Sequence, residues 1–200
     1  MEIERIQREL RFLRIVTLIL FLALVGTWLI GASPKQNSQF DTIEVKSIKI
    51  IDDKSVARLV FAAELPNPKV QGKEYPRSTK VAGIQFNDSL GNEIGGLAIF
   101  DRLDGAGLCF DYGTAEAVCL TKIEKFGYTG LVMLDQPKPE SQVGQTGSQR
   151  VLIAIENGES KLVLNDKDGK ERIRLVVDTS NVARAEFLDQ NGKIVYQIPQ

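Results

Sequence analysis

The uncharged stretch from Ile15 to Pro34 constrains this chain more than any other feature. It runs for twenty residues without an Asp, Glu, Lys or Arg. At about 1.5 Å per residue, an α-helix of that length is about 30 Å long, which matches the hydrocarbon core of a bilayer. We therefore expect a transmembrane helix over residues 15–34, a short linker over 35–40 and a single domain over 41–200.

A cleaved signal peptide is the alternative interpretation of this stretch. Gly31-Ala32-Ser33 resembles the small-residue site of signal cleavage, but the apolar run is longer than the usual core of about 7–15 residues. Trp28, near its end, suits the headgroup level of a spanning helix. No cysteine follows directly to carry a lipid, so we expect a retained anchor.

The basic residues that flank the stretch predict its orientation. Four arginines lie within the first 14 residues, whereas Lys35, Lys46 and Lys49 on the other side are more widely spaced. Positively charged flanks remain preferentially in the cytoplasm. We expect the N-terminus inside the cell and the large domain outside the cytoplasm.

The first 14 residues form a short segment that we expect to be an amphipathic cytoplasmic helix. Apolar residues recur there at heptad positions, and the same stripe continues into the span through small residues that let membrane helices approach closely. The candidate helix-packing face consists of Ile3, Ile6, Leu10, Leu13, Thr17, Leu20, Leu24, Thr27 and Gly31. The alternative is a helix at the membrane interface with its arginines at the headgroups.

The chain contains no histidine, which removes several classes of active site. Ser-His-Asp and Cys-His catalysis need this side chain, and so do the usual zinc and non-haem iron centres. With 25 basic and 26 acidic residues, the net charge of −1 offers no basic footprint for nucleic acid. We assign no catalytic residue, no cofactor and no metal ligand, and we expect no nucleic-acid partner.

Short apolar runs separated by turn residues dominate the region after residue 40. Several runs end in an acidic residue, and Asp and Asn favour turns because their side chains bond the backbone two residues ahead. These endings are Phe86-Asn87-Asp88, Met133-Leu134-Asp135, Leu164-Asn165-Asp166, Val176-Val177-Asp178 and Phe187-Leu188-Asp189. The pattern predicts an all-β fold, an antiparallel meander closing into a sandwich or barrel. One segment, Asp166-Lys167-Asp168-Gly169, partly matches a calcium-binding loop, but we interpret it as a hairpin turn.

Alternation is clearest near the C-terminus, where it predicts which residues form the core. Apolar and charged residues alternate with a period of two, as in strands with one buried face. We expect Ile173, Leu175, Val177, Ala185, Phe187, Ile194 and Tyr196 to be buried. We expect Arg172, Arg174, Arg184 and Glu186 to be largely exposed.

The two cysteines, Cys109 and Cys119, flank a segment that reads as a tight hairpin. Pairing around Thr114 would place their sulfurs on opposed strands, so a disulfide in an oxidising compartment is one interpretation. Two buried free thiols are the other. A bridge requires the Cα atoms to lie within about 4.4–6.8 Å of each other.

Two longer segments interrupt the strand pattern, and we expect both to be mobile loops. They lie near residues 65–80 and 136–149, the first rich in Pro and basic residues, the second in Gln, Pro, Ser and Gly. Lys73, Tyr75 and Arg77 make the first a candidate partner-binding loop, because a tyrosine among cations suits an interface. Its alternative is a solvated connection between strands.

The turn motifs together resemble those of a group of uncharacterised bacterial membrane-anchored proteins. The matching residues are Phe86-Asn87-Asp88 with Gly91, Glu93 and Gly95-Gly96-Leu97, Leu164-Asn165-Asp166-Lys167-Asp168-Gly169-Lys170 leading into Arg172-Ile173-Arg174-Leu175, and Phe187-Leu188-Asp189 with Gly192-Lys193. The resemblance covers most of residues 40–200 and implies one span in the bacterial inner membrane with a strand-rich periplasmic domain. It implies no activity. Cys109 and Cys119 stand where that group more usually has polar residues.

Three functions remain compatible with the sequence. We expect a non-enzymatic accessory subunit that docks on a larger membrane complex through its helix and β domain. The alternatives are a free-standing tethered binding module and, less favoured, a carboxylate- or metal-dependent enzyme. The expected partners are the lipid bilayer and other integral membrane subunits, and a homo-oligomer is compatible with the pattern.

Overall fold

The computed structural model describes residues 1–31 and 39–199, which fall into two units. The first is Met1–Glu44 and the second is Val45–Gln200. Residues 32–38 and 200 are not described, so the end of the predicted span and most of the predicted linker over 35–40 lie outside the described residues.

The first unit contains one α-helix, α1, which covers Glu2–Gly31. Its Arg5–Thr27 segment is long and apolar enough to cross a membrane, by length and composition, although a signal sequence meets the same criteria. The hydroxyls of Thr17 and Thr27 donate to the carbonyls of Leu13 and Leu24 at 2.9 and 2.8 Å. Both polar side chains are thereby satisfied within the helix, as an apolar surrounding requires.

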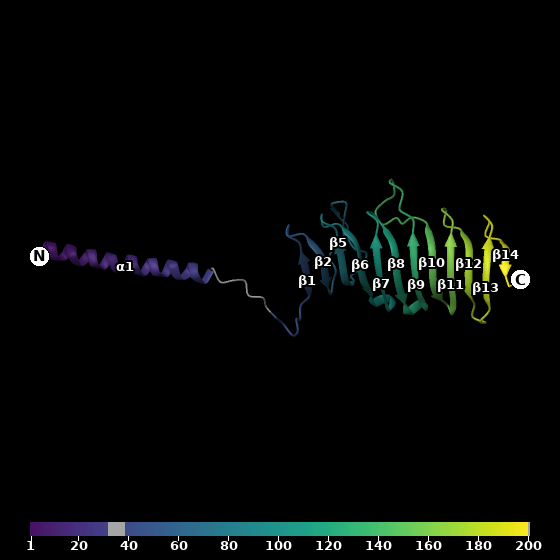
Figure 1. Cartoon of the computed structure of the whole chain (residues 1–200), viewed down its shortest axis with the longest axis horizontal. Coiled ribbons are helices and arrows are strands. Elements are labelled where there is room, and N and C mark those ends of the chain that lie inside the picture. Colours follow the sequence, from purple (N-terminus) through teal and green to yellow (C-terminus); the bar gives the residue numbers. More distant parts are fainter. Residues whose placement is uncertain (32–38, 200) are drawn as a thin grey trace. The chain divides into compact units, whose positions relative to one another are not determined.

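The second unit is a meander in which twelve strands follow one another in a single antiparallel sheet (Figure 1). The sheet consists of β1 (Ser47–Ile51), β2 (Ala57–Ala62), β5 (Ala82–Asn87), β6 (Glu93–Phe100), β7 (Gly105–Asp111), β8 (Glu116–Ile123), β9 (Tyr128–Leu134), β10 (Gln149–Glu156), β11 (Glu159–Asn165), β12 (Glu171–Val177), β13 (Ala183–Leu188) and β14 (Ile194–Ile198). A small ribbon of β3 (Lys69–Val70) and β4 (Lys73–Glu74) is inserted between β2 and β5, and short 3-10 turns cover Asp101–Leu103 and Glu124–Phe126. The all-β meander is confirmed.

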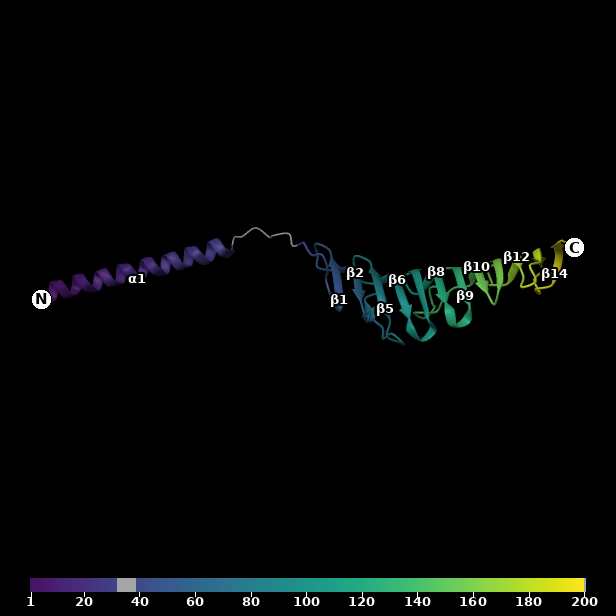
Figure 2. The same cartoon turned by 90° about the horizontal axis from the view of Figure 1, so that it is seen from below.

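The sheet is open, and the expected closure into a sandwich or barrel does not occur. Strand order follows chain order, so β1 and β14 form the two opposite edges. The view turned by 90° shows the strands in one layer (Figure 2). Closure would need the first strand to pair with the last, or a second sheet to pack on the first. Here every strand is used in pairing with its sequence neighbours.

Four of the five acidic turns predicted from the sequence share one geometry, and the turn at Asp52, which was not predicted, has it too. In these five turns one aspartate oxygen accepts the backbone N–H groups two and four residues later, at 2.8–3.0 Å. The third residue after the aspartate has a positive φ in each case. The aspartates are Asp52, Asp88, Asp166, Asp178 and Asp189, and the positive-φ residues are Ser55, Gly91, Gly169, Asn181 and Gly192. Asp135 differs, because it begins the long connection to β10.

The prediction of which face of the C-terminal strands is buried is wrong, because the residues expected outside are the more buried ones. Leu175 is 46% exposed and Phe187 is 38% exposed, whereas Glu186 is only 3% exposed and Val176 only 6%. Val177, Ile194 and Tyr196 are also exposed. The remaining residues of the two predicted sets are half-buried, namely Arg172, Ile173, Arg174, Arg184 and Ala185. The charged residues lie inward because Arg174 and Arg184 both bind the carboxylate of Glu186, with Arg184 Nε 3.2 Å from it. The face that looks like a core in the sequence is therefore bare in one chain.

Candidate functional site

Cross-strand register divides the sheet into two faces with different chemistry. Residues directly opposite one another in an antiparallel pair point to the same side. One row of such residues crosses all twelve strands on what we call the apolar face. It consists of Ile48, Phe61, Ile84, Leu97, Leu108, Leu120, Leu131, Ile153, Leu162, Leu175, Ala185 and Ile198.

Two further rows flank this central row on the apolar face. Phe86, Phe110, Met133, Leu164 and Phe187 belong to one of them. The other consists of Ala82, Ile99, Ala106, Lys122, Thr129, Ile155, Ser160, Val177 and Ala183. Lys122 is the only charged residue that these three rows contain within the described strands. The apolar face therefore offers almost pure hydrophobic surface.

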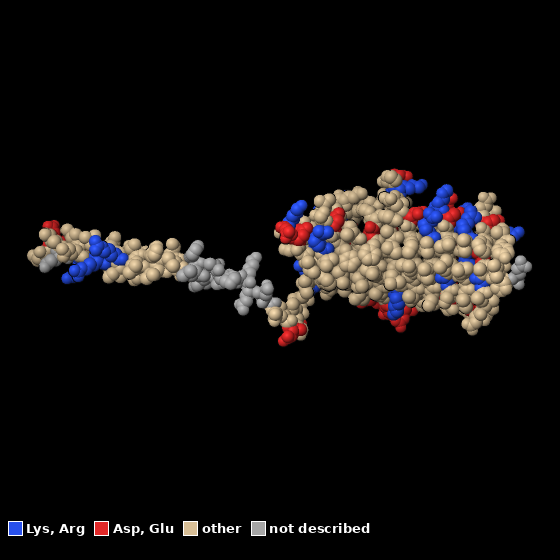
Figure 3. Space-filling view, in the orientation of Figure 1, with Lys and Arg blue, Asp and Glu red and all other residues tan. Residues whose placement is uncertain are grey.

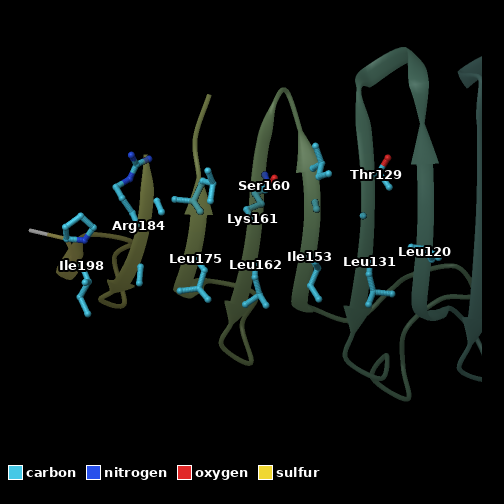
Figure 4. Close-up of a pocket in the computed structure, with 18 residues that line it drawn as sticks. Leu120, Thr129, Leu131, Ile153, Ser160, Lys161, Leu162, Leu175, Arg184 and Ile198 are labelled. Atoms are coloured by element: carbon cyan, nitrogen blue, oxygen red, sulfur yellow. The ribbon is translucent and has the colours of Figure 1, made fainter. Parts of the chain in front are cut away.

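A shallow groove of about 890 Å³ runs over the C-terminal half of the apolar face. Leu131, Ile153, Leu162 and Leu175 form a row along it on neighbouring strands (Figure 4). Small residues, among them Ser160, help to keep it open. Leu120 at 54% and Ile153 at 46% exposure show how much apolar surface remains uncovered. Soluble monomers rarely leave so large a contiguous apolar patch exposed.

Few charged side chains lie in the middle of the domain in the space-filling view, and those that do are basic side chains toward its C-terminal end (Figure 3). In Figure 3 most Lys, Arg, Asp and Glu side chains of the sheet domain gather along its upper and lower borders, and uncharged atoms fill most of the area between them. The borders hold the turns, whose aspartates pair with nearby arginines such as Arg172 with Asp166 at 2.9 Å. These pairs are half-buried at the ends of the strands.

The opposite face, which we call the covered face, is partly overlaid by two connections. The segment between β2 and β5 lies over β5–β7 and encloses a cleft of about 500 Å³ lined by Leu65, Arg77, Gly107 and Cys109. The connection from β9 to β10 reaches the β7–β8 turn, where Gly144 N–H donates to the carbonyl of Thr114 at 2.8 Å. These two connections bury this side of the sheet in place of a second sheet.

Arg77 fastens the first of these connections to the sheet. Its guanidinium donates to the carbonyl of Pro66 at 2.7 Å, to Oε1 of Gln85 at 3.0 Å and to Oε2 of Glu93 at 2.8 Å. Gln85 is 3% exposed and its amide donates to Oδ1 of Asn87 at 2.9 Å. This network is internally satisfied, which is how buried polar groups are tolerated.

Three carboxylates share the rim of this network. Burial raises the pKa of Glu93, although the Arg77 cation opposes the rise. Burial, together with the charges of Glu116 and Glu93, raises the pKa of Asp111 to about 6. A cleft of about 180 Å³ beside them is lined by Asp111, Glu116 and Arg77. Perturbed carboxylates can mark a functional site, but structural ion-pair networks perturb them equally.

The structure gives this acidic rim no further feature of an active site. No group of three Asp, Glu, Cys or His side chains among residues 1–31 and 39–199 is placed to hold a metal ion. Arg77, the only cation of the network, already serves Glu93 and the loop. The arrangement clamps the connection between β2 and β5 to the sheet.

Cys109 and Cys119 face each other directly on β7 and β8. Their sulfurs are joined in a disulfide, and their Cα atoms are 4.2 Å apart, just under the expected range. The disulfide lies on the covered face, where Cys109 lines the larger cleft. It ties together β7 and β8, the strands that carry Asp111 and Glu116.

Some of the residues predicted for binding are exposed, and others are turned toward the sheet. The residues of the helix-packing face, from Ile3 to Thr27, are exposed along α1, while the surroundings of Gly31 lie outside the described residues. Lys73 lies over the ring of Tyr75, with its ammonium nitrogen 5.4 Å from the ring centre. Arg77 points inward to its clamp and is not available to a partner.

Sequence reasoning missed both surfaces that the structure brings out. Gln85, Glu93 and Asp111 are separated in the sequence and show no motif. The apolar face had a signal, the alternation with a period of two, but this was interpreted as a buried core. No family model matches the chain, and no curated protein matches its sequence.

Proposed function

We propose that this protein is a non-enzymatic, membrane-anchored accessory subunit that docks on a larger membrane assembly through α1 and the apolar face. One observation carries the proposal: twelve strands present three rows of almost uncharged residues, and members of these rows such as Leu120, Ile153 and Phe187 are 38–54% exposed in the described sheet domain. Leaving this surface in water costs free energy in proportion to its area. A protein partner that covers it removes that cost.

The anchor and the disulfide support a placement outside the cytoplasm. The apolar part of α1 suits a single span in the bacterial inner membrane, and the arginines before it favour an N-terminus in the cytoplasm. The Cys109–Cys119 bridge agrees, because disulfides persist in oxidising compartments such as the periplasm. A cysteine replacing Asp41 should then react with a membrane-impermeant thiol reagent in intact cells, and reaction only after lysis would reverse the topology.

A second candidate function is a tethered binding module for an elongated apolar ligand. The groove of about 890 Å³ on the apolar face favours it, because ligand sites are concave and mostly apolar. In this case the purified protein would carry a small apolar molecule, and the covered face would still have only its structural role. The accessory-subunit proposal predicts protein on the face instead.

Purification from native membranes in a mild detergent tests the accessory role. The native protein should migrate in a particle larger than its own 22.2 kDa chain. Replacing the span of α1 with polyleucine, or Leu131 with Glu on the apolar face, should reduce this association while leaving the protein in the membrane. Migration of the native protein as a single chain, unchanged by either replacement, would contradict the proposal.

A further inference from the structure

We infer that the protein covering the apolar face is a second copy of this chain, packed face to face as the second layer of a β-sandwich. The inference rests on the proposed function, since it names a second copy as the protein that covers this surface and leaves α1 of each copy as the part that docks on other membrane subunits. Two sheets that pack on one another keep their strands within about 30° and lie about 10 Å apart. A single chain of this protein supplies only one of those two layers.

The size of the apolar face fits a dimer. Twelve strands at about 4.8 Å spacing span about 55 Å, and the three rows cover about 14 Å along the strands before the side chains are added. The footprint is therefore about 800–1,000 Å² per copy, against about 800 Å² per partner in a standard stable interface. An acyl chain would cover only a strip of this width and leave the remaining rows in water.

The charge pattern also favours a copy over a lipid or a polar protein. Lys122 is the only charge in the three rows, and it is held by the carbonyl of Asp104 and by Glu124 at one end of the strand. Lys161 and Arg184 also line the groove, but both are paired with carboxylates of the same chain, Lys161 with Glu156 at 2.6 Å and Arg184 with Asp178 and Glu186, so neither is free to bind a lipid headgroup. An uncharged face of this width is complementary to another uncharged face of the same dimensions, and an identical copy provides one.

The positions of the large side chains and of the groove on the apolar face suggest a particular two-fold arrangement. The N-terminal half carries the large rings of Phe61, Phe86 and Phe110, whereas the groove lies over the C-terminal half. A two-fold axis parallel to the strands and midway along the strand order, between β8 and β9, places each half over the other half of the partner. Phe61, in the central row, then lies over the partner's groove, while Phe86 and Phe110 lie over the partner's row that contains Met133, Leu164 and Phe187. Leu120 of each copy lies against Leu131 of the other at the centre.

The alternation of apolar and charged residues in the C-terminal strands agrees with this assembly. Leu175 and Phe187 alternate with charged residues as core residues do, yet they are exposed in one chain. In the face-to-face dimer they belong to the interface core, and Glu186 remains with its arginines on the outer side. Both chains are tethered to one membrane, which raises their effective concentration for each other.

The test uses the full-length protein expressed alone and purified in a mild detergent. Light scattering, corrected for bound detergent, should give twice the mass of the 22.2 kDa chain. Ile153→Glu places a charge at a site that is 46% exposed in the monomer, so it should leave the circular dichroism unchanged and lower the mass to one chain. The matched control is Val195→Glu, at a valine that is 64% exposed on the other side of the edge strand β14, and it should remain dimeric.

Cross-linking provides a readout that does not depend on a charged variant. A single added cysteine replacing Leu131, beside the proposed axis, should couple to its counterpart through a short bifunctional thiol reagent, whereas one replacing Val195 should not. A dimer insensitive to Ile153→Glu, or a trimer, would overturn the arrangement. A monomer whose face is protected in native membranes by another protein would overturn the inference and leave the accessory role standing. A monomer carrying lipid would overturn both.

Discussion

Removing the charge of Asp111 is expected to stabilise the protein at neutral pH. The pKa of this carboxyl is raised to about 6, first by burial and then by the charges of Glu116 and Glu93. At pH 7 the folded state therefore holds an ionised group in an unfavourable setting. Asp111→Asn keeps the shape of the side chain and gives the neighbouring carboxylates an amide donor.

The size and pH dependence of this effect follow from proton linkage. The folded pKa of about 6 lies above the ordinary value of 3.8, so the folded protein binds more protons between these two pH values. The native protein should lose stability as the pH rises from 4 to 6 and should lose no more from this group above that range. Because Asp111 is partly exposed, solvent screening reduces the full linkage value to a gain of about 1–2 kcal/mol for the variant at pH 7.

Urea unfolding of the full-length protein, followed by far-ultraviolet circular dichroism between pH 3.5 and 8, measures this difference. The gain of Asp111→Asn should be present at pH 7 and vanish near pH 3.5. Asp53→Asn changes an exposed aspartate in the β1–β2 turn and serves as the control. A variant that is less stable than the native protein at pH 7, or a gain that persists at pH 3.5, would refute the argument.

Two further substitutions test the covered face. Arg77→Ala removes three hydrogen bonds and leaves Glu93 half-buried without its cation, so the free energy of unfolding should fall by about 2–3 kcal/mol, whereas Lys73→Ala on the exposed ribbon should change it by less than about 0.5 kcal/mol. Gly83 has φ +154°, and an added Cβ would lie 1.9 Å from the carbonyl oxygen of Leu97, so Gly83→Ala should lose more than about 3 kcal/mol in the same unfolding assay. Gly113→Ala, where a Cβ meets nothing within 4 Å, should be neutral, and equal losses at the two glycines would show that the close approach at β5–β6 is not the cause.

Local chemistry explains why the strands and turns could be predicted. The aspartate turns need only a few consecutive residues, because one carboxylate oxygen binds backbone N–H groups two and four positions later. The hairpin turns at Asp166 and Asp178 can therefore be predicted from the sequence. The apolar helix is equally local, since its length and composition define it.

The burial of each face could not be predicted because it depends on what lies above the sheet. Alternation shows that Leu175 and Glu186 point to opposite sides, and it assigns the inside by hydrophobicity alone. Within one chain the covered face is instead buried by two connections and by arginines that neutralise Glu186. The clamp at Arg77 joins residues from distant segments, so no sequence motif predicts it.

The state of the apolar face in native membranes tests the central claim most directly. A single cysteine replacing Ile153 on the apolar face, or Val195 on the other side of β14, can be exposed to a membrane-impermeant maleimide in cells with a permeabilised outer membrane. If a protein covers the apolar face, the cysteine at position 153 should react many times more slowly than the cysteine at position 195. Unfolding in urea should make the two rates equal. Equal rapid labelling of both positions in the native membrane would show that the face is bare, and would contradict the claim.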